Sequence, residues 1–404
     1  MKNIFLPVLC MLSYFVHADS WTQKADLPGD DRGASAGFSI NGKGYIGTGI
    51  KFAAPVPFHD DFWEYDPATN VWTQKADFGG AGRCGAVGFS VSDKGYIACG
   101  SDGNGVQQDI WEYDPVLNSW LQKAGLPGPG RNYTVAFVID SIAYLGTGYD
   151  AMSSSYQDLW EFNPASNVWT AKANVGGGVR SSAMAFSVGS KGYIGGGYSA
   201  TYMDDFWEYD PASNAWTQKA NIPGGGRSDG AAFAIGDYGY ILTGQLSTQT
   251  AKDVQQYNPL TNTWTQKLNL TGSARSCAVA FSAGSKGYIS TGYDPVFVTQ
   301  RDLWEYSPDS ISTTGINNLS AENDFKIFPN PADDELQVQY GHGKFFNSTI
   351  IFSDVKGKTV LTYFLNSFSG SEKINVADLR NGVYFYKIVR EEKNLETGKI
   401  LIRH

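Results

Sequence analysis

Short apolar stretches separated by polar turn residues run along most of the chain. Residues 85–100, GAVGFSVSDKGYIACG, and residues 181–197, SSAMAFSVGSKGYIGGG, each contain two such stretches around a polar turn. Stretches this short, bounded by Gly, Ser and Asp, are typical of hairpin-connected β-strands and not of helices. The pattern therefore predicts an all-β fold.

The hydrophobic pattern recurs with a period of 47 to 51 residues, which is marked by tryptophan. Each of six tryptophans is followed after 11 residues by an arginine, and each arginine after 13 residues by a tyrosine. The tryptophans are Trp21, Trp72, Trp120, Trp169, Trp216 and Trp264, and the arginines are Arg32, Arg83, Arg131, Arg180, Arg227 and Arg275. A period of this length indicates an array of equivalent structural units, here called copies one to six, with one of these arginines in each.

Each copy continues, after a segment of variable length, with an aspartate that lies 11 residues before the position of the next tryptophan. In copy one this segment is DFWEYDPATNVW, residues 61–72. Its DP-x-x-N sequence predicts a hairpin turn between two further strands. Copy five has Gln255 and Gln256 in place of Trp-Glu, and copy six has Thr313 where the closing tryptophan is expected.

The arginine, the apolar-Tyr strand that ends in Gly and the Tyr-Asp-Pro-x-x-Asn-x-Trp hairpin resemble the kelch repeat. The resemblance covers residues 21 to about 308. It implies a six-bladed β-propeller, with one four-stranded antiparallel blade per copy around a central channel. Because copy six lacks its closing strand, we expect the N-terminal strand at Trp21 to complete the last blade and close the ring. The predicted propeller spans residues 19–308.

Two further segments flank the predicted propeller. Residues 1–18 combine Lys2, an apolar run and Ala18 before a cleavage point, which predicts a signal peptide. Residues 309–324 are polar and without periodicity, and are expected to be a linker. Residues 325–404 contain FPNP and INVADLRNGVYFYKI and end in TGKILIRH. This tail resembles the C-terminal type IX secretion sorting domain of Bacteroidota, which implies a small β-sandwich and the type IX translocon as a partner.

These segments together predict export through the periplasm, to a secreted form or to the outer surface of the outer membrane. The net charge of −9 excludes docking onto nucleic acid or anionic lipid, and no transmembrane segment is expected. With four histidines in the chain, no metal or other cofactor is expected. Cys84 and Cys99 fall on consecutive predicted strands, where either a disulfide or two buried thiols would fit.

The six arginines are the first candidate ligand site. We expect them at the mouth of the channel, where a collar of guanidinium groups would suit a carboxylate or a sugar acid. A structural contact would recur in the same way, because each arginine could pair with the aspartate of its copy or with the acidic residue of Trp-Glu-Tyr. Structural pairing is favoured, since an unpaired inward-facing charge would be costly.

The variable segments provide the second candidate site, because residues that break the repeat are free to determine specificity. Their side chains could stack on sugars, bury against a protein or only pack the loops. The candidates are Phe58, His59, Tyr149, Tyr156 and Tyr202, with Phe52, Tyr198, Tyr293 and Phe297 in the same segments.

The favoured function is that of a binding module for an extracellular glycan or protein. The alternative, implied by the kelch resemblance, is a glycan-processing enzyme such as a sialic acid mutarotase that uses the arginine collar. A third interpretation is a rigid spacer in an adhesion or matrix protein. No Ser-His-Asp set, phosphate loop or Cys/His metal spacing is present in the sequence, so a non-enzymatic role is favoured.

Overall fold

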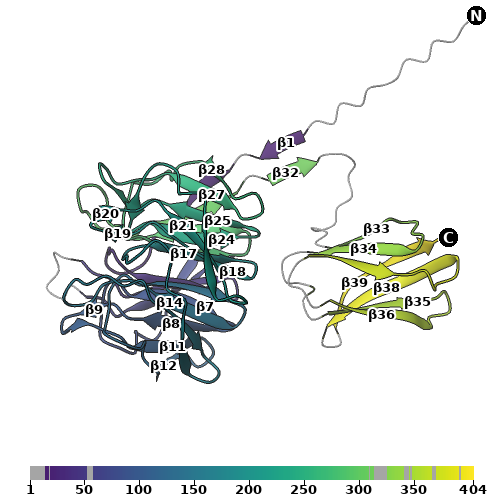
Figure 1. Ribbon diagram of the computed structural model, residues 1–404, viewed down its shortest axis with the longest axis horizontal. Coiled ribbons are helices and arrows are strands. Elements are labelled where there is room, and N and C mark those ends of the chain that lie inside the picture. Colours follow the sequence, from purple (N-terminus) through teal and green to yellow (C-terminus); the bar gives the residue numbers. More distant parts are fainter. Residues whose placement is uncertain are drawn as a thin grey trace, which may run out of the picture. The chain divides into compact units, whose positions relative to one another are not determined.

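The computed structural model describes residues 14–17, 19–51, 58–308, 310–313, 325–340, 345, 348–365, 370–390 and 393–404 (Figure 1). The chain divides into two compact units, Met1–Thr313 and Thr314–His404. All regular elements in the described residues are β-strands, which confirms the predicted all-β class. None of these residues belongs to a helix long and apolar enough to cross a membrane.

Within its described residues, the first unit contains six four-stranded antiparallel sheets, one for each copy. The sheets are β3 (Ala36–Ile40), β4 (Lys43–Gly47), β5 (Phe62–Asp66), β6 (Val71–Gln74); β7 (Val87–Val91), β8 (Lys94–Ala98), β11 (Ile110–Asp114), β12 (Ser119–Lys123); β13 (Val135–Ile139), β14 (Ile142–Gly146), β15 (Leu159–Asn163), β16 (Val168–Lys172); β17 (Met184–Val188), β18 (Lys191–Gly195), β21 (Phe206–Asp210), β22 (Ala215–Lys219); β24 (Ala231–Ile235), β25 (Tyr238–Leu242), β27 (Val254–Asn258), β28 (Thr263–Lys267); and β29 (Val279–Ala283), β30 (Lys286–Ser290), β31 (Leu303–Ser307), β2 (Ser20–Lys24).

The turn residues explain the register of each sheet. In copy one, Asn41 and Gly42 connect β3 to β4 with φ values of 51° and 78°, the conformation that lets a two-residue turn match the twist of its strands. Between β5 and β6, the Asp66 carboxylate accepts a hydrogen bond from the backbone N–H of Ala68 at 2.9 Å, as the DP-x-x-N sequence predicts.

Successive sheets are joined by the tryptophan and asparagine of the repeat. In copy one, Trp72 Nε1 donates to the carbonyl oxygen of Ala25 at 2.8 Å, and Asn70 Oδ1 accepts from the Ala25 N–H at 2.9 Å and from the Tyr65 hydroxyl at 2.9 Å. The indoles of the next four copies donate to the preceding copy in the same way. The first strands of neighbouring sheets also lie in contact, including β29 with β3.

The N-terminal strand β2 completes the sheet of copy six by pairing with β31. Trp21 Nε1 donates to the Leu268 carbonyl at 3.0 Å, as the other repeat tryptophans do. Asp19 takes the place of the repeat asparagine, because its Oδ2 accepts from the Leu268 N–H at 2.7 Å and from the Tyr306 hydroxyl at 3.0 Å. The closing strand that copy six lacks is therefore provided by the N-terminal end of the chain.

Shorter strands extend the loops of the first unit. β1 (Tyr14–His17) pairs with β32 (Ser310–Thr313), within the predicted signal peptide and linker, whose boundaries stay predictions. The remaining short strands are β9 (Ser101–Asp102), β10 (Gly105–Val106), β19 (Tyr198–Ser199), β20 (Thr201–Tyr202), β23 (Arg227–Ser228) and β26 (Gln245–Leu246).

The second unit consists of two antiparallel sheets around one apolar core. The strands are β33 (Phe325–Phe328), β34 (Glu335–Tyr340) and β37 (Gly370–Asn375) in one sheet, and β35 (Ser348–Ser353), β36 (Thr359–Leu365), β38 (Gly382–Arg390) and β39 (Lys393–Ile402) in the other. Leu336 and Ile374 from the first sheet share the core with Ile350 and Ile388 from the second. Two sheets that share a core in this way form a small sandwich.

Candidate ligand site at the channel mouth

The six repeated arginines are buried, and each is paired with the aspartate of its own copy. All six are at most 1% exposed. In copy four, Arg180 donates to both carboxylate oxygens of Asp205 at 2.8 and 2.7 Å, and to the carbonyl of Gly196 at 3.0 Å. Two-point hydrogen bonds between opposite charges offset the desolvation of both ions. The other pairs are Arg32–Asp61, Arg83–Asp109, Arg131–Asp158, Arg227–Asp253 and Arg275–Asp302.

The first tryptophan of the Asp-x-Trp-Glu segment binds the same aspartate. Trp207 Nε1 donates to Asp205 Oδ2 at 2.7 Å, and the equivalent bond recurs in copies one, two, three and six. Copy five replaces the indole with Gln255, whose Nε2 donates to Asp253 Oδ2 at 3.0 Å. The Gln-Gln departure seen in the sequence therefore retains the donor that the repeat requires.

The electrostatics of two pairs show how strongly arginine holds the carboxylate. Burial by itself raises the pKa of Asp61, yet the hydrogen bond and positive charge of Arg32 bring it below its ordinary value. The pKa of Asp302 is lowered by Arg275 against the same effect of burial. Both carboxylates are thus ionised partners of a buried cation at neutral pH.

The sequence offers two acidic partners for each arginine, and in the structure the partner is the aspartate. The glutamate of Trp-Glu-Tyr has other partners: in copy one, Glu64 accepts from the Tyr45 hydroxyl at 2.6 Å and from Lys43 at 2.8 Å. A ligand anion would have to reach a buried guanidinium that a carboxylate already occupies. Ligand binding by the arginine collar stays a prediction, and this burial and pairing weigh against it.

The six first strands line a cavity of about 180 Å³, here called the central channel. Each copy contributes four consecutive residues, beginning two positions after its arginine, and most of them are Gly, Ala, Ser or Val. Small side chains at these positions keep the centre of the ring open, because larger side chains would fill it. The lining segments are residues 34–37, 85–88, 133–136, 182–185, 229–232 and 277–280.

One end of the channel is encircled by a circuit of backbone hydrogen bonds, and we call this end the channel mouth. Each of its six residues donates its N–H to the carbonyl of the equivalent residue in the preceding copy, as Gly85 does to Ala34, and Ala34 donates to Cys277 at 2.9 Å. All six have φ between 51° and 61°, the left-handed conformation that side chains rarely adopt. They are Ala34, Gly85, Tyr133, Ser182, Asp229 and Cys277.

Three of these mouth residues carry chemistry that the sequence analysis did not select. Asp229 is partly buried and accepts from the Ser228 hydroxyl at 2.6 Å. Burial, and next the negative charge of Asp229, raise the pKa of the Cys277 thiol well above its ordinary value, so the thiol is protonated and not a nucleophile. Burial likewise raises the pKa of Tyr133. The available signal was positional: the residue two places after each arginine differs in every copy.

The structure brings two of the predicted loop tyrosines, Tyr149 and Tyr293, close to this mouth. Tyr149 stacks on Tyr133 with ring centroids 6.0 Å apart and an angle of 20° between the ring planes. Tyr156 lies under the Arg131 guanidinium, 4.3 Å from the ring centroid, and donates its hydroxyl to Asp150 at 2.8 Å. Tyr149 is thus placed to contact a ligand at the mouth, whereas Tyr156 also packs the loop against a structural arginine.

The other predicted loop residues make contacts within their own segments or with the arginine of their copy. Phe58 forms an isolated β-bridge with Ile50. Burial, followed by the charge of nearby Arg32, lowers the pKa of His59, which is therefore neutral at pH 7. Tyr202 packs edge-to-face on Tyr198, 5.3 Å between ring centroids. Phe52 falls outside the described residues.

The three cysteines of the described residues, Cys84, Cys99 and Cys277, are free. Cys84 forms a β-bridge with Ser101 instead of opposing Cys99. Burial raises the pKa of Cys99 to about 12. In the structure, Cys84 and Cys99 are therefore two free thiols and do not form a disulfide.

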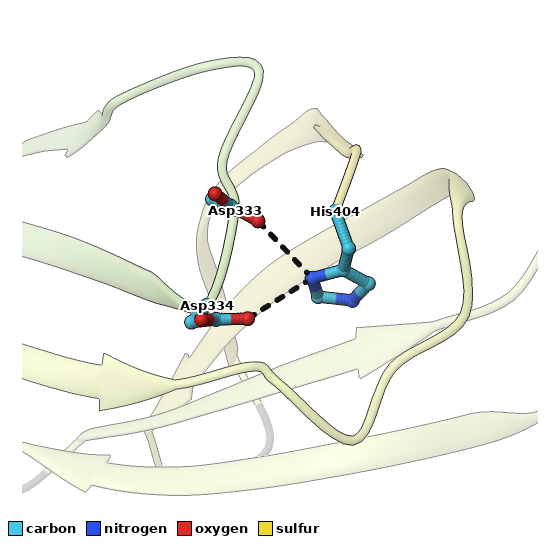
Figure 2. Close-up of side chains that lie close together, drawn as sticks. All are labelled: Asp333, Asp334 and His404. Atoms are coloured by element: carbon cyan, nitrogen blue, oxygen red, sulfur yellow. Dashed lines mark ion pairs between the residues drawn. The ribbon is translucent and has the colours of Figure 1, made fainter.

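Asp333, Asp334 and His404 form a separate exposed cluster in the second unit (Figure 2). His404 Nδ1 lies 3.5 Å from Asp333 and 3.2 Å from Asp334, while Nε2 lies 2.6 Å from the Leu379 carbonyl. The carbonyl and then the two carboxylates raise the pKa of His404, and both ring nitrogens face acceptors. When both ring nitrogens are protonated, His404 forms an ion pair with these two carboxylates just after the end of β39.

Comparison with known proteins identifies the tail and supports the fold of the first unit. Residues 326–403 match the family model described as the secretion system C-terminal sorting domain. The match confirms the predicted sorting domain and indicates secretion by the type IX system, to the medium or the cell surface. No curated protein matches the chain. A solved structure titled "Structure of YjhT" is similar with a TM-score of 0.61 and 17% identity, over 71% of this chain and 99% of that one.

These findings define a class of protein: an exported chain that combines a β-propeller fold with a type IX sorting domain. At 17% identity, the structural similarity concerns the fold alone.

Proposed function

We propose that the first unit is a six-bladed kelch propeller, closed by its N-terminal strand, that acts outside the cell as a binding module for a glycan or a protein. The observation that supports this proposal most directly is a contrast within the repeat. The repeated Arg, Asp and Trp side chains are bound to one another, whereas the six residues at the channel mouth share one backbone circuit and differ in side chain. A scaffold of this kind can vary its ligand contacts without disturbing its sheets.

The proposed binding surface consists of the channel mouth and the loops beside it. Tyr133 and Tyr149 offer stacked aromatic rings, which suit the apolar face of a sugar or an apolar group of a protein. Asp229, Cys277 and Ser182 add polar groups around the open end of the channel. A few polar groups around a recess with apolar walls are the common composition of a ligand site.

A glycan array with the purified secreted protein tests this proposal, beside the variants Tyr149→Ala and Tyr238→Ala. Tyr238 is a partly exposed tyrosine at the first residue of β25, at the opposite end of the channel-lining hairpin, and serves as the matched control. We expect Tyr149→Ala to lose about 10-fold in affinity through the lost stacking, with Tyr238→Ala unchanged. Equal binding by both variants would contradict the mouth as the site. Failure to bind any glycan or any cell-surface protein would contradict the binding module itself.

The mutarotase alternative stays a prediction that the arginine collar does not favour. The arginines are buried in ion pairs, and Asp229 places a negative charge where an anionic sugar would enter. An anomer-exchange assay with sialic acid would decide it, since measurable exchange by the wild type would restore this alternative.

A further inference from the structure

We infer that the channel mouth recognises a ligand through a protonated amino group, as carried by an unacetylated amino sugar. The inference rests on the proposed binding function and names the chemistry of its ligand.

The first argument is the charge at the mouth. Among the described residues that line the channel, Asp229 is the single Asp, Glu, Lys or Arg. The neighbouring arginines do not neutralise it, because each already faces the aspartate of its own copy. Asp229 accepts from the Ser228 hydroxyl at Oδ2 and also forms a side-chain hydrogen bond with the Cys277 thiol, whereas a carboxylate can accept about four hydrogen bonds in all. The mouth therefore has a net negative charge with acceptor capacity left for a cationic donor.

The second argument is the aromatic surroundings. Tyr133, from the same backbone circuit as Asp229, stacks with Tyr149. Tyr293 lies against Gly33, next to the mouth residue Ala34, so closely that a side chain at position 33 would meet its ring at 2.3 Å. The faces of aromatic rings attract cations, and a carboxylate among tyrosine rings is a favourable environment for an ammonium group. The same environment disfavours a ligand carboxylate, in contrast to an arginine collar.

The third argument favours a sugar over a simple alkylamine. Ser35 and Ser182 line the channel together with Asp229. Ser182 is partly exposed and belongs to the backbone circuit of the mouth. Hydroxyl groups next to the ammonium group of an amino sugar would provide partners that an alkyl chain lacks.

Calorimetric titration of the secreted protein at pH 6.5 tests the inference with three probes: glucosamine, N-acetylglucosamine and Nα-acetyl-lysine amide. Acetylation removes the positive charge and leaves the other sugar hydroxyls, so the first two probes isolate the ammonium group. We expect glucosamine to bind at least about 10-fold more tightly than N-acetylglucosamine. A hydrogen bond to a charged group contributes more binding free energy than one to a neutral group.

Asp229→Asn removes the charge and retains a residue that tolerates positive φ, so the backbone circuit is preserved. The matched control is Asp237→Asn, an exposed aspartate in the turn before β25 of the same copy. We expect Asp229→Asn to lose about 10-fold in glucosamine affinity and Asp237→Asn to keep it.

Equal affinity for glucosamine and its acetylated form, or full glucosamine affinity in Asp229→Asn, would overturn the inference. Binding of the lysine derivative as tightly as glucosamine would overturn the assignment to a sugar. If the array detects only ligands without amino groups, the inference fails and the proposed binding function stands.

Discussion

A buried arginine between the two oxygens of an aspartate is the residue-scale unit on which the first unit depends. Removing either partner leaves the charge of the other without its counter-ion, at a site where the Arg180 side chain is fully buried and the Asp205 side chain is 17% exposed. For Arg180→Met, which leaves Asp205 without its cation, we expect the free energy of unfolding to fall by about 3–5 kcal/mol. Urea unfolding followed by tryptophan fluorescence measures the loss.

The exposed pair Lys191–Asp210, in the same sheet, is the control for this prediction. Its two side chains are about one-third exposed, with 2.7 Å between Nζ and Oδ2. Lys191→Met is expected to cost less than about 1 kcal/mol, because solvent screens such a pair. Similar losses for both variants would show that burial does not set the strength of the Arg180 contact.

At the scale of elements, Asp19 connects the N-terminal strand to two copies at once. It accepts from Leu268 of copy five and from Tyr306 of copy six, where the other copies use asparagine. Asp19→Ala is expected to lower the free energy of unfolding by about 1–3 kcal/mol, because two donors lose their acceptor. Asp19→Asn restores the acceptor of the repeat and should retain most of the stability. Equal losses in thermal unfolding of both variants would contradict this role.

Contacts made by repeated side chains can be predicted from the sequence, whereas contacts made by backbone atoms or by a substituted side chain are harder to predict. The absence of tryptophan at position 313 predicted the pairing of β2 with β31, because tryptophan spacing marks the outer strand. The role of Asp19 was missed because the other copies have Asn two residues before the tryptophan. An aspartate at this position is a different residue type, but its side-chain oxygen can accept the same hydrogen bonds. The circuit at Tyr133 and Asp229 was missed because backbone-to-backbone contacts require no particular side chain, so that its only trace in the sequence is a position that differs in every copy.

At the scale of the whole molecule, the two units have separate apolar cores. Domains with their own cores unfold as separate cooperative transitions, unless a large apolar interface couples them. We expect calorimetry of the full chain to show two transitions. Arg180→Met should lower the midpoint of one transition, and Ile374→Ala, which removes a side chain only 1% exposed from the second core, should lower the midpoint of the other.

The independence of the two transitions matters for export, because the sorting domain belongs to a different unit from the propeller. If the cores are separate, a variant of the propeller changes binding without changing recognition of the tail. Asp229→Asn should therefore leave the amount of protein in the medium or on the cell surface unchanged, as quantified by immunoblotting. A single calorimetric transition that both Arg180→Met and Ile374→Ala shift by similar amounts would show instead that the units fold as one, and stability of the cargo would then limit secretion.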